Sequence, residues 1–205
     1  YREPRGIGFG PQIAKVAVLE ALAELKGPQI TGLIAGILTS YISRGPNAER
    51  HIWHDGDYLS VCIAALKALV KRHDEPVAFE LLRAIALDNE RHRRLHWQMR
   101  ATAYEGYLLG QLSRRDIRDP VAQADFLLSL LSGTGEGHAD DWVPGESGVK
   151  TQEAIKNSAV IRILVHLGPE VLPQIRRELE ATGEDQPRRR EALERVIQLI
   201  ERAST

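Results

Sequence analysis

The sequence has 205 residues, of which 43% are hydrophobic and 27% charged, and its formal net charge is −1. This length suffices for a sizeable core within one domain or one continuous repeat array. The near-neutral charge provides no global attraction to nucleic acid or acidic lipid, and no apolar run reaches the roughly 18 residues that a membrane span needs. The single cysteine, Cys62, cannot form a disulfide within the chain, and its apolar helical surroundings predict a core residue.

The first ten residues differ from the rest of the chain. They are rich in glycine and lack a helical period, which predicts an N-terminal arm or linker over residues 1–10, ahead of a single domain over residues 11–205. The chain starts at Tyr1, so either a leader has been removed or the sequence is a piece of a longer protein. Composition does not fix the compartment, and we favour the cytoplasm.

From Pro11 onward, apolar residues recur at three- and four-residue intervals, which is the pattern of helices with one apolar face. Proline, glycine and polar residues interrupt this pattern and predict where each helix starts and stops. The predicted helices run from Pro11 to the Gly27-Pro28 stop, from Pro28 to about Ser43, from about Asp57 to His73, from Pro76 through Leu87, around Met99–Leu112, from Pro120 to Gly133, on either side of Gly168-Pro169, and over about 188–203. Residues typical of strands are sparse and do not alternate, so we expect an all-α fold.

Four prolines mark a repeat. Pro28, Pro76, Pro120 and Pro169 each open the second helix of a predicted pair, at separations of 48, 44 and 49 residues. Two-helix solenoid repeats have a period of about 40–47 residues. Six and ten residues after each proline stand apolar residues that would form one ridge per helix: Ile34, Leu82, Phe126 and Ile175, then Leu38, Ala86, Leu130 and Leu179. Because only stacked neighbours can cover such ridges, we predict an α-solenoid of about four antiparallel helix pairs plus a C-terminal capping helix.

Two of these helix junctions resemble HEAT-like repeats. They read A-V-L-E-A-L-A-E-L-K-G-P-Q-I at residues 17–30 and A-V-I-R-I-L-V-H-L-G-P-E-V-L-P-Q-I at residues 159–175, whereas the two middle repeats lack the glycine before the proline. As architecture, the resemblance covers about residues 11–202. It implies a non-catalytic scaffold or adaptor without a cofactor, whose second helices line a groove for a protein or peptide partner.

Two other functions stay open beside the scaffold. Some HEAT-like proteins are DNA glycosylases or bind nucleic acid in other ways, but such proteins are strongly basic, and this chain has a net charge of −1. We therefore do not expect nucleic acid as a partner. The other alternative is a structural spacer within a larger multidomain protein.

The loop before the third helix, H-I-W-H-D-G-D-Y at residues 51–58, contains two imidazoles and two carboxylates that could bind a divalent metal. Their spacing is irregular, and Asp55 or Asp57 suits the N-cap of the next helix. We therefore predict no metal site here. Trp53 and His54 are predicted to contact a partner, because an aromatic side chain in a polar loop is typical of interface anchors. Packing of Trp53 against the neighbouring helix pair is the alternative.

The segment E-R-H-R-R-L-H-W contains His92 and His96 at helical i, i+4 spacing. A zinc-protease helix needs a glutamate directly after the first histidine, and this sequence has Arg93 there. Cationic neighbours also oppose a metal ion. We predict an anion-binding cluster formed by Arg91, Arg93 and Arg94, with a solvated helix face as the alternative.

The segment G-T-G-E-G-H-A-D-D-W-V-P-G-E-S-G, residues 133–148, is longer than the connections of a compact helical array. It lacks the alternating ligand register of a calcium loop. We predict that Asp140, Asp141 and Trp142 bind a partner, because long irregular loops often carry function. A mobile insertion is the alternative.

The two ends of the array differ in their polarity. The last helix is predicted to turn Val196, Ile197 and Ile200 toward the array and Arg195, Glu201 and Arg202 outward, as expected of a cap. The first helix has no such polar cover, so we expect homo-association through the N-terminal end or additional chain there. The arginines at 188–190, which begin the last helix, either face the acidic stretch 180–185 or mark a docking site.

Overall fold

The computed structural model describes residues 11–43, 56–88, 95–135 and 150–204, and over these ranges the chain forms α-helices, one short 3-10 helix and no strand. The elements are α1 (Pro11–Glu24), α2 (Pro28–Ile42), α3 (Gly56–Val70), α4 (Pro76–Leu87), α6 (Trp97–Arg114), α7 (Pro120–Leu130), α8 (Gln152–Leu167), η3 (Pro169–Val171), α9 (Leu172–Ala181) and α10 (Pro187–Ala203). The predicted all-α fold is confirmed. Within the same ranges, no helix has the length and apolar character to cross a membrane.

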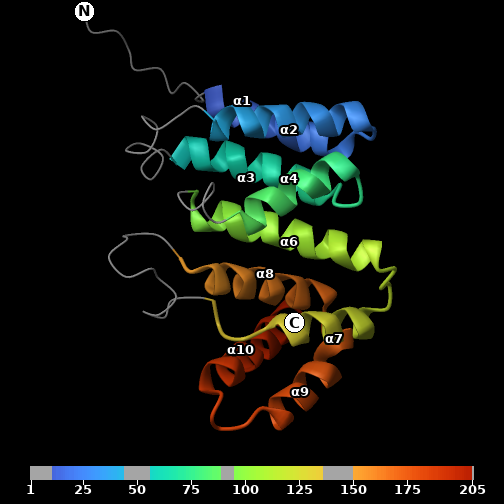
Figure 1. The fold of residues 1–205 in the computed structure, drawn as a ribbon, viewed down its shortest axis with the longest axis vertical. Helices are drawn as coiled ribbons and strands as arrows, with labels where there is room; N and C mark the ends of the chain where they lie inside the picture. The colour runs from blue at the N-terminus through green and yellow to red at the C-terminus, as the bar shows by residue number, and fades with distance from the viewer. Residues whose placement is uncertain (1–10, 44–55, 89–94, 136–149, 205) are drawn as a thin grey trace, which may run out of the picture.

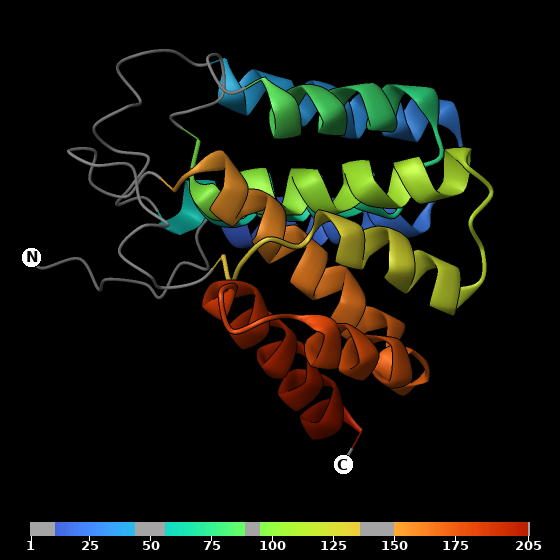
Figure 2. The same ribbon diagram turned by 60° about the horizontal axis from the view of Figure 1, so that its bottom comes forward.

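The helices are stacked along the long axis of the molecule, with α1 and α2 at one end and α9 and α10 at the other (Figure 1). The stack departs from chain order at one point, because α8 rather than α7 lies beside α6. One helix of each predicted pair, together with α10, forms a continuous layer in which α1, α3, α6, α8 and α10 contact one another in turn. We call this the first-helix layer. Beside it, α2 contacts α3 and α4, α4 contacts α6, and α7 contacts α8 and α9. Figure 2 shows the axes of α8 and α10 turned relative to those of α4 and α6, so the helix direction changes along the molecule.

The four prolines start helices at the positions that the sequence predicts. They are the first residues of α2 (Pro28), α4 (Pro76), α7 (Pro120) and η3 (Pro169). Proline suits this position because its φ is already helical and its missing N–H would have no partner there. Gly27 and Gly168, at φ 120° and 79°, turn the chain immediately before two of these prolines, in a conformation that residues with a Cβ rarely adopt.

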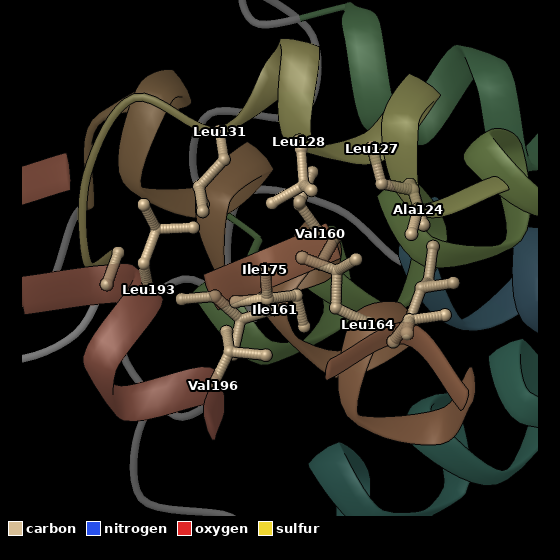
Figure 3. Packing of buried hydrophobic residues seen from close by; sticks show 14 of the residues in the cluster. Ala124, Leu127, Leu128, Leu131, Val160, Ile161, Leu164, Ile175, Leu193 and Val196 are labelled. Atoms are coloured by element: carbon tan, nitrogen blue, oxygen red, sulfur yellow. The ribbon is translucent and has the colours of Figure 1, made fainter. Parts of the chain in front are cut away.

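The predicted apolar ridges are buried in the first two pairs but displaced in the third. In α2 and α4 the buried ridge residues are Ile34, Leu38, Leu82 and Ala86. In α7, Phe126 and Leu130 pack against the core but are only half-buried, so the fully buried positions of this helix differ from those predicted. The residues of α7 that are buried against α8 and its neighbours are Ala124, Leu127 and Leu128 (Figure 3). The reason is that α7 packs mainly on α8 and α9, which selects a different side of the helix.

Helix α6 connects two apolar cores. Met99 and Ala103, in its first half, belong to the core that α6 shares with α1–α4. Leu108, in its second half, belongs to the core that α6 shares with α7–α10. Figure 3 shows part of this second core, where side chains from α7, α8, α9 and α10 converge. One helix therefore belongs to both halves of the stack.

Two glycines let α6 approach its neighbours closely. A Cβ at Gly106 would lie 2.7 Å from Cδ1 of Leu82, and a Cβ at Gly110 would lie 2.4 Å from Cδ2 of Phe79. Both distances are shorter than a van der Waals contact, so a larger residue would force the side chain of Leu82 or Phe79 in α4 to shift. These glycines are four residues apart in the sequence and so lie on the same side of the helix, a pattern that could have predicted this close contact.

A buried arginine secures the C-terminal end of α1. Arg72 is 5% exposed, and its guanidinium donates to the carbonyl oxygens of Leu22 (2.9 Å), Ala23 (3.0 Å) and Leu25. The last carbonyls of a helix lack partners within the helix and carry partial negative charge. Arg72 supplies both hydrogen bonds and positive charge, and so holds α1 against α3.

Arg189 performs the same task for α7. It donates to the carbonyl oxygens of Leu128 (2.9 Å) and Leu131, and it pairs with Glu178 at 2.5 Å. Its neighbour Arg190 pairs with Glu194 at 3.5 Å. Both arginines thus bind within the fold. The two acidic partners lie outside the stretch 180–185 that the sequence suggested, although Nη1 of Arg190 also donates to the carbonyl oxygen of Thr182 within it at 3.5 Å.

Replacing Gly110 by Ala is expected to destabilise the protein by about 1–3 kcal/mol, because the added methyl group overpacks the contact between α6 and α4. This loss outweighs the gain in helix propensity of about 1 kcal/mol that Gly→Ala gives at an unhindered site. The matched control is Gly32→Ala in α2, where no atom lies within 4 Å of the added Cβ. Urea unfolding followed by circular dichroism measures both changes, and a Gly110→Ala protein as stable as the control would contradict the prediction.

Candidate partner-binding groove

The site residues predicted from the sequence lie outside the described residues and stay predictions. They are Trp53 and His54, then Arg91, Arg93 and Arg94, and finally Asp140, Asp141 and Trp142. What the structure does describe are the flanks of these segments and the surfaces formed by the helices.

The two ends of the segment 136–149 are joined at the N-terminal end of α8. Nζ of Lys150 donates to the carbonyl oxygen of Gly135 at 2.9 Å and lies 4.3 Å from the centre of the Trp97 ring. Oγ of Ser158 donates to the same carbonyl oxygen at 2.7 Å. Gly135 has φ 61°, and a Cβ there would lie 2.5 Å from the carbonyl oxygen of Ala154. This tight junction fixes both attachment points of the segment that contains the predicted partner-binding residues.

His96 has a structural role. Its Nδ1 accepts a hydrogen bond from the backbone N–H of Gln98 at 3.2 Å, so that it caps the N-terminus of α6. Burial lowers the pKa of His96, which favours the neutral ring that this acceptor role requires. In the part of the chain that the structure describes, no three His, Cys, Asp or Glu side chains cluster as metal ligands would.

Cys62 is a core residue, as predicted. It is 1% exposed, and burial raises the pKa of its thiol to about 11. The thiol is therefore protonated near neutral pH, whereas the thiolate is the nucleophilic form.

A polar groove of about 400 Å³ crosses the first-helix layer near its middle. Its lining comes from three helices that are stacked side by side: Ile63, Lys67 and Val70 of α3, Gln98, Thr102 and Glu105 of α6, and Arg162 of α8. We call it the central groove. The HEAT-like resemblance implied a groove on the second helices, whereas this groove lies on the first helices.

Glu105 and Arg162 form the polar centre of the central groove. Nη1 of Arg162 lies 3.7 Å from Oε2 of Glu105, and it donates to Oγ1 of Thr102 at 3.4 Å. Burial raises the pKa of Glu105, and the opposing effects of Arg162, His166 and Lys67 are smaller. The groove therefore holds a carboxylate in a partly desolvated position, with its side chain 28% exposed.

The positive charges of Lys67 and Arg162 in the central groove exceed the negative charge of Glu105. Among the described residues, Lys67 makes no ion pair, and the contacts of Arg162 involve only Nη1. Arg162 thus keeps N–H donors on Nε and Nη2. Two cations and one carboxylate give the groove a net positive charge. The sequence reading missed these residues, although each is an isolated charge within an apolar stretch of helix.

A second, apolar groove lies at the α1–α2 end of the molecule. It has a volume of about 450 Å³ and is lined by Ala14, Lys15, Val18, Leu19, Ile37, Ser40, Tyr41 and Val61. Large exposed apolar side chains gather on the same two helices and just beyond α1: Ile13 (56% exposed), Val18 (56%), Leu25 (53%) and Leu33 (50%). Exposed apolar surface of this kind is typical of an interaction site.

Replacing Glu105 by Gln is expected to stabilise the fold increasingly as the pH rises. Because burial raises the pKa of Glu105 above its ordinary value of 4.5, the folded protein holds this proton more tightly than the unfolded chain does. The carboxyl group thus supports the fold below its ordinary pKa, and this contribution is lost as the pH rises through the raised pKa. The free energy of unfolding of Glu105→Gln relative to wild type should therefore grow between about pH 4 and about pH 7 in urea titrations.

Glu80→Gln is the control, because it also removes one carboxylate, but at an exposed position of α4 where 62% of the side chain is accessible. A difference between Glu105→Gln and wild type that stays constant over this pH range would refute the raised pKa.

No protein-family model matches the chain, and no curated protein or solved structure is significantly similar to it. The function proposed below therefore rests on the chain's own helices, grooves and charges.

Proposed function

We propose that this protein is a HEAT-like α-solenoid that acts as a non-catalytic scaffold and binds a protein or peptide partner. The proposal is supported by the stacking of the helices along the long axis (Figure 1) and by the proline that starts one helix in each of the four predicted pairs. In such arrays each repeat contacts mainly its neighbours, which leaves long side faces for binding.

The observation that carries the proposal is the first-helix layer. It brings side chains from α3, α6 and α8, which are far apart in the sequence, onto one surface and into one groove. We propose that Asp140, Asp141 and Trp142 add to this surface, because the segment that contains them is attached at Gly135 and Lys150, beside the start of α8.

Capture of partners from lysate of the source cell, followed by mass spectrometry, tests the scaffold. The baits are the wild-type protein and a variant in which Trp142, Asp140 and Asp141 are changed to Ala. We expect a protein that the wild type retains and the variant loses. A protein retained by both baits would keep the scaffold and move the contact away from this segment. Recovery of nothing specific would refute the scaffold. Recovery of nucleic acid alone would refute it too and would favour the nucleic-acid-binding alternative.

We further propose that two copies associate through the α1 end. The exposed residues Ala14, Val18, Ala21 and Leu25 follow one another at intervals of four, three and four residues, the spacing of helix–helix seams. The opposite end is covered differently, because α10 buries Leu193, Val196 and Ile200 and carries charged residues on its exposed side. Among the described residues, large apolar side chains are thus exposed at the α1 end and not at the α10 end, which favours a closed, two-fold pairing.

Sedimentation of the 205 residues tests this pairing. We expect a dimer for the wild type and a monomer for Val18→Glu, because the added carboxylate would be buried without a partner in the paired seam. Val77→Glu is the matched control, since Val77 is also exposed (50%) but lies on α4. A wild-type protein that stays monomeric at high concentration would refute the pairing.

A further inference from the structure

The central groove has a fixed geometry, because the residues beneath its polar groups are buried. Lys67 follows Leu66 of α3, and Arg162 lies between Ile161 and Ile163 of α8; these three apolar neighbours are at most 2% exposed. The apolar cores therefore hold the backbones that carry Lys67, Glu105 and Arg162. Their charged groups project from three different helices into one depression of about 400 Å³.

Arg162 is the strongest anion-binding group in this groove. Its side chain is 38% exposed, and Nη1 lies 3.7 Å from Glu105, which is beyond hydrogen-bond length. Nε and Nη2 form one edge of the planar guanidinium, and this edge matches the two oxygens of a carboxylate. Because the pair with Glu105 involves Nη1, the edge formed by Nε and Nη2 stays available to a ligand.

Lys67 and the apolar side chains beside it indicate what other groups a ligand of this groove would have. Lys67 is exposed and adds a second positive charge from α3. Ile63 and Val70, on the same helix, are half-buried and offer apolar surface beside that charge. Glu105 and Gln98 supply acceptors on α6 that a peptide N–H could reach. The groove therefore combines cations, hydrogen-bond acceptors and a small apolar surface.

We propose that the central groove binds a short acidic peptide segment of the partner, with a carboxylate held by Arg162 and Lys67 and a neighbouring apolar side chain against Ile63 and Val70. This inference rests on the scaffold function proposed above and names the chemistry of its partner. A nucleic acid fits less well, because its successive phosphates require a row of cations. Here Glu105 interrupts the positive charge, and the chain as a whole has a net charge of −1.

Selection from a displayed library of random short peptides tests this assignment. Peptides that bind immobilised protein carrying both Lys67→Gln and Arg162→Gln are first removed, and the remainder is selected on the wild type. We expect the retained peptides to be enriched in Asp or Glu next to an apolar residue. Retention of no peptide, or of peptides without acidic residues, would refute the proposal.

One enriched peptide is then labelled and titrated with single variants. Lys67→Gln and Arg162→Gln should each weaken binding by about tenfold, as expected for the loss of a charge-assisted contact. Arg162→Lys keeps the charge but loses the planar edge, so it should restore only part of the affinity. The matched control is Arg177→Gln, at an exposed arginine of α9 outside the groove, which should bind like the wild type.

Circular dichroism first establishes that each variant is folded, and Arg162→Lys serves as the conservative variant if Arg162→Gln is not. Equal affinity of the wild type and a folded Arg162 variant would refute the proposal, as would a labelled single-stranded DNA that competes for the groove. If lysate capture retains a partner while the groove variants bind the peptide normally, the scaffold stands and the groove assignment fails.

Discussion

The close contact of α6 with its neighbours is the constraint on which the rest of the structure depends. Gly106 and Gly110 let α4 approach α6, and the two ends of α6 belong to different apolar cores. A single helix thereby couples α1–α4 to α7–α10. Because interiors are packed to the density of crystals, a shift of α6 would be transmitted to both cores and to the central groove that α6 lines.

Arginine has two distinct uses in this stack. Arg72 and Arg189 are largely buried and donate to carbonyl groups at the ends of α1 and α7. Their charges serve the fold, because they satisfy groups that a helix end leaves unpaired. Arg162 is more exposed and lines the central groove, and its hydrogen bond and ion pair among the described residues involve Nη1 alone. The distinction between structural and binding arginines thus follows from where the carbonyl groups lie, which sequence composition does not reveal.

The same packing creates both surfaces that we assign to binding. Stacking α3, α6 and α8 side by side leaves the central groove between their exposed sides. Among the described residues, none covers Val18 of α1 or Leu33 of α2, which are 56% and 50% exposed at this end of the stack. The central groove is flanked by the charged side chains of Lys67, Glu105 and Arg162, whereas the groove at the α1–α2 end is lined mainly by apolar residues.

The sequence by itself determined the helices and most of their boundaries, because proline and glycine impose local backbone geometry that does not depend on distant residues. It also identified Cys62 and the ridges of α2 and α4 as core. Only the tertiary structure decided which side of α7 is buried, since that depends on α8 and α9. The tertiary structure also brings Lys67, Glu105 and Arg162 together. These residues are 38 and 57 positions apart in the chain, and only the stacking of their helices makes them neighbours.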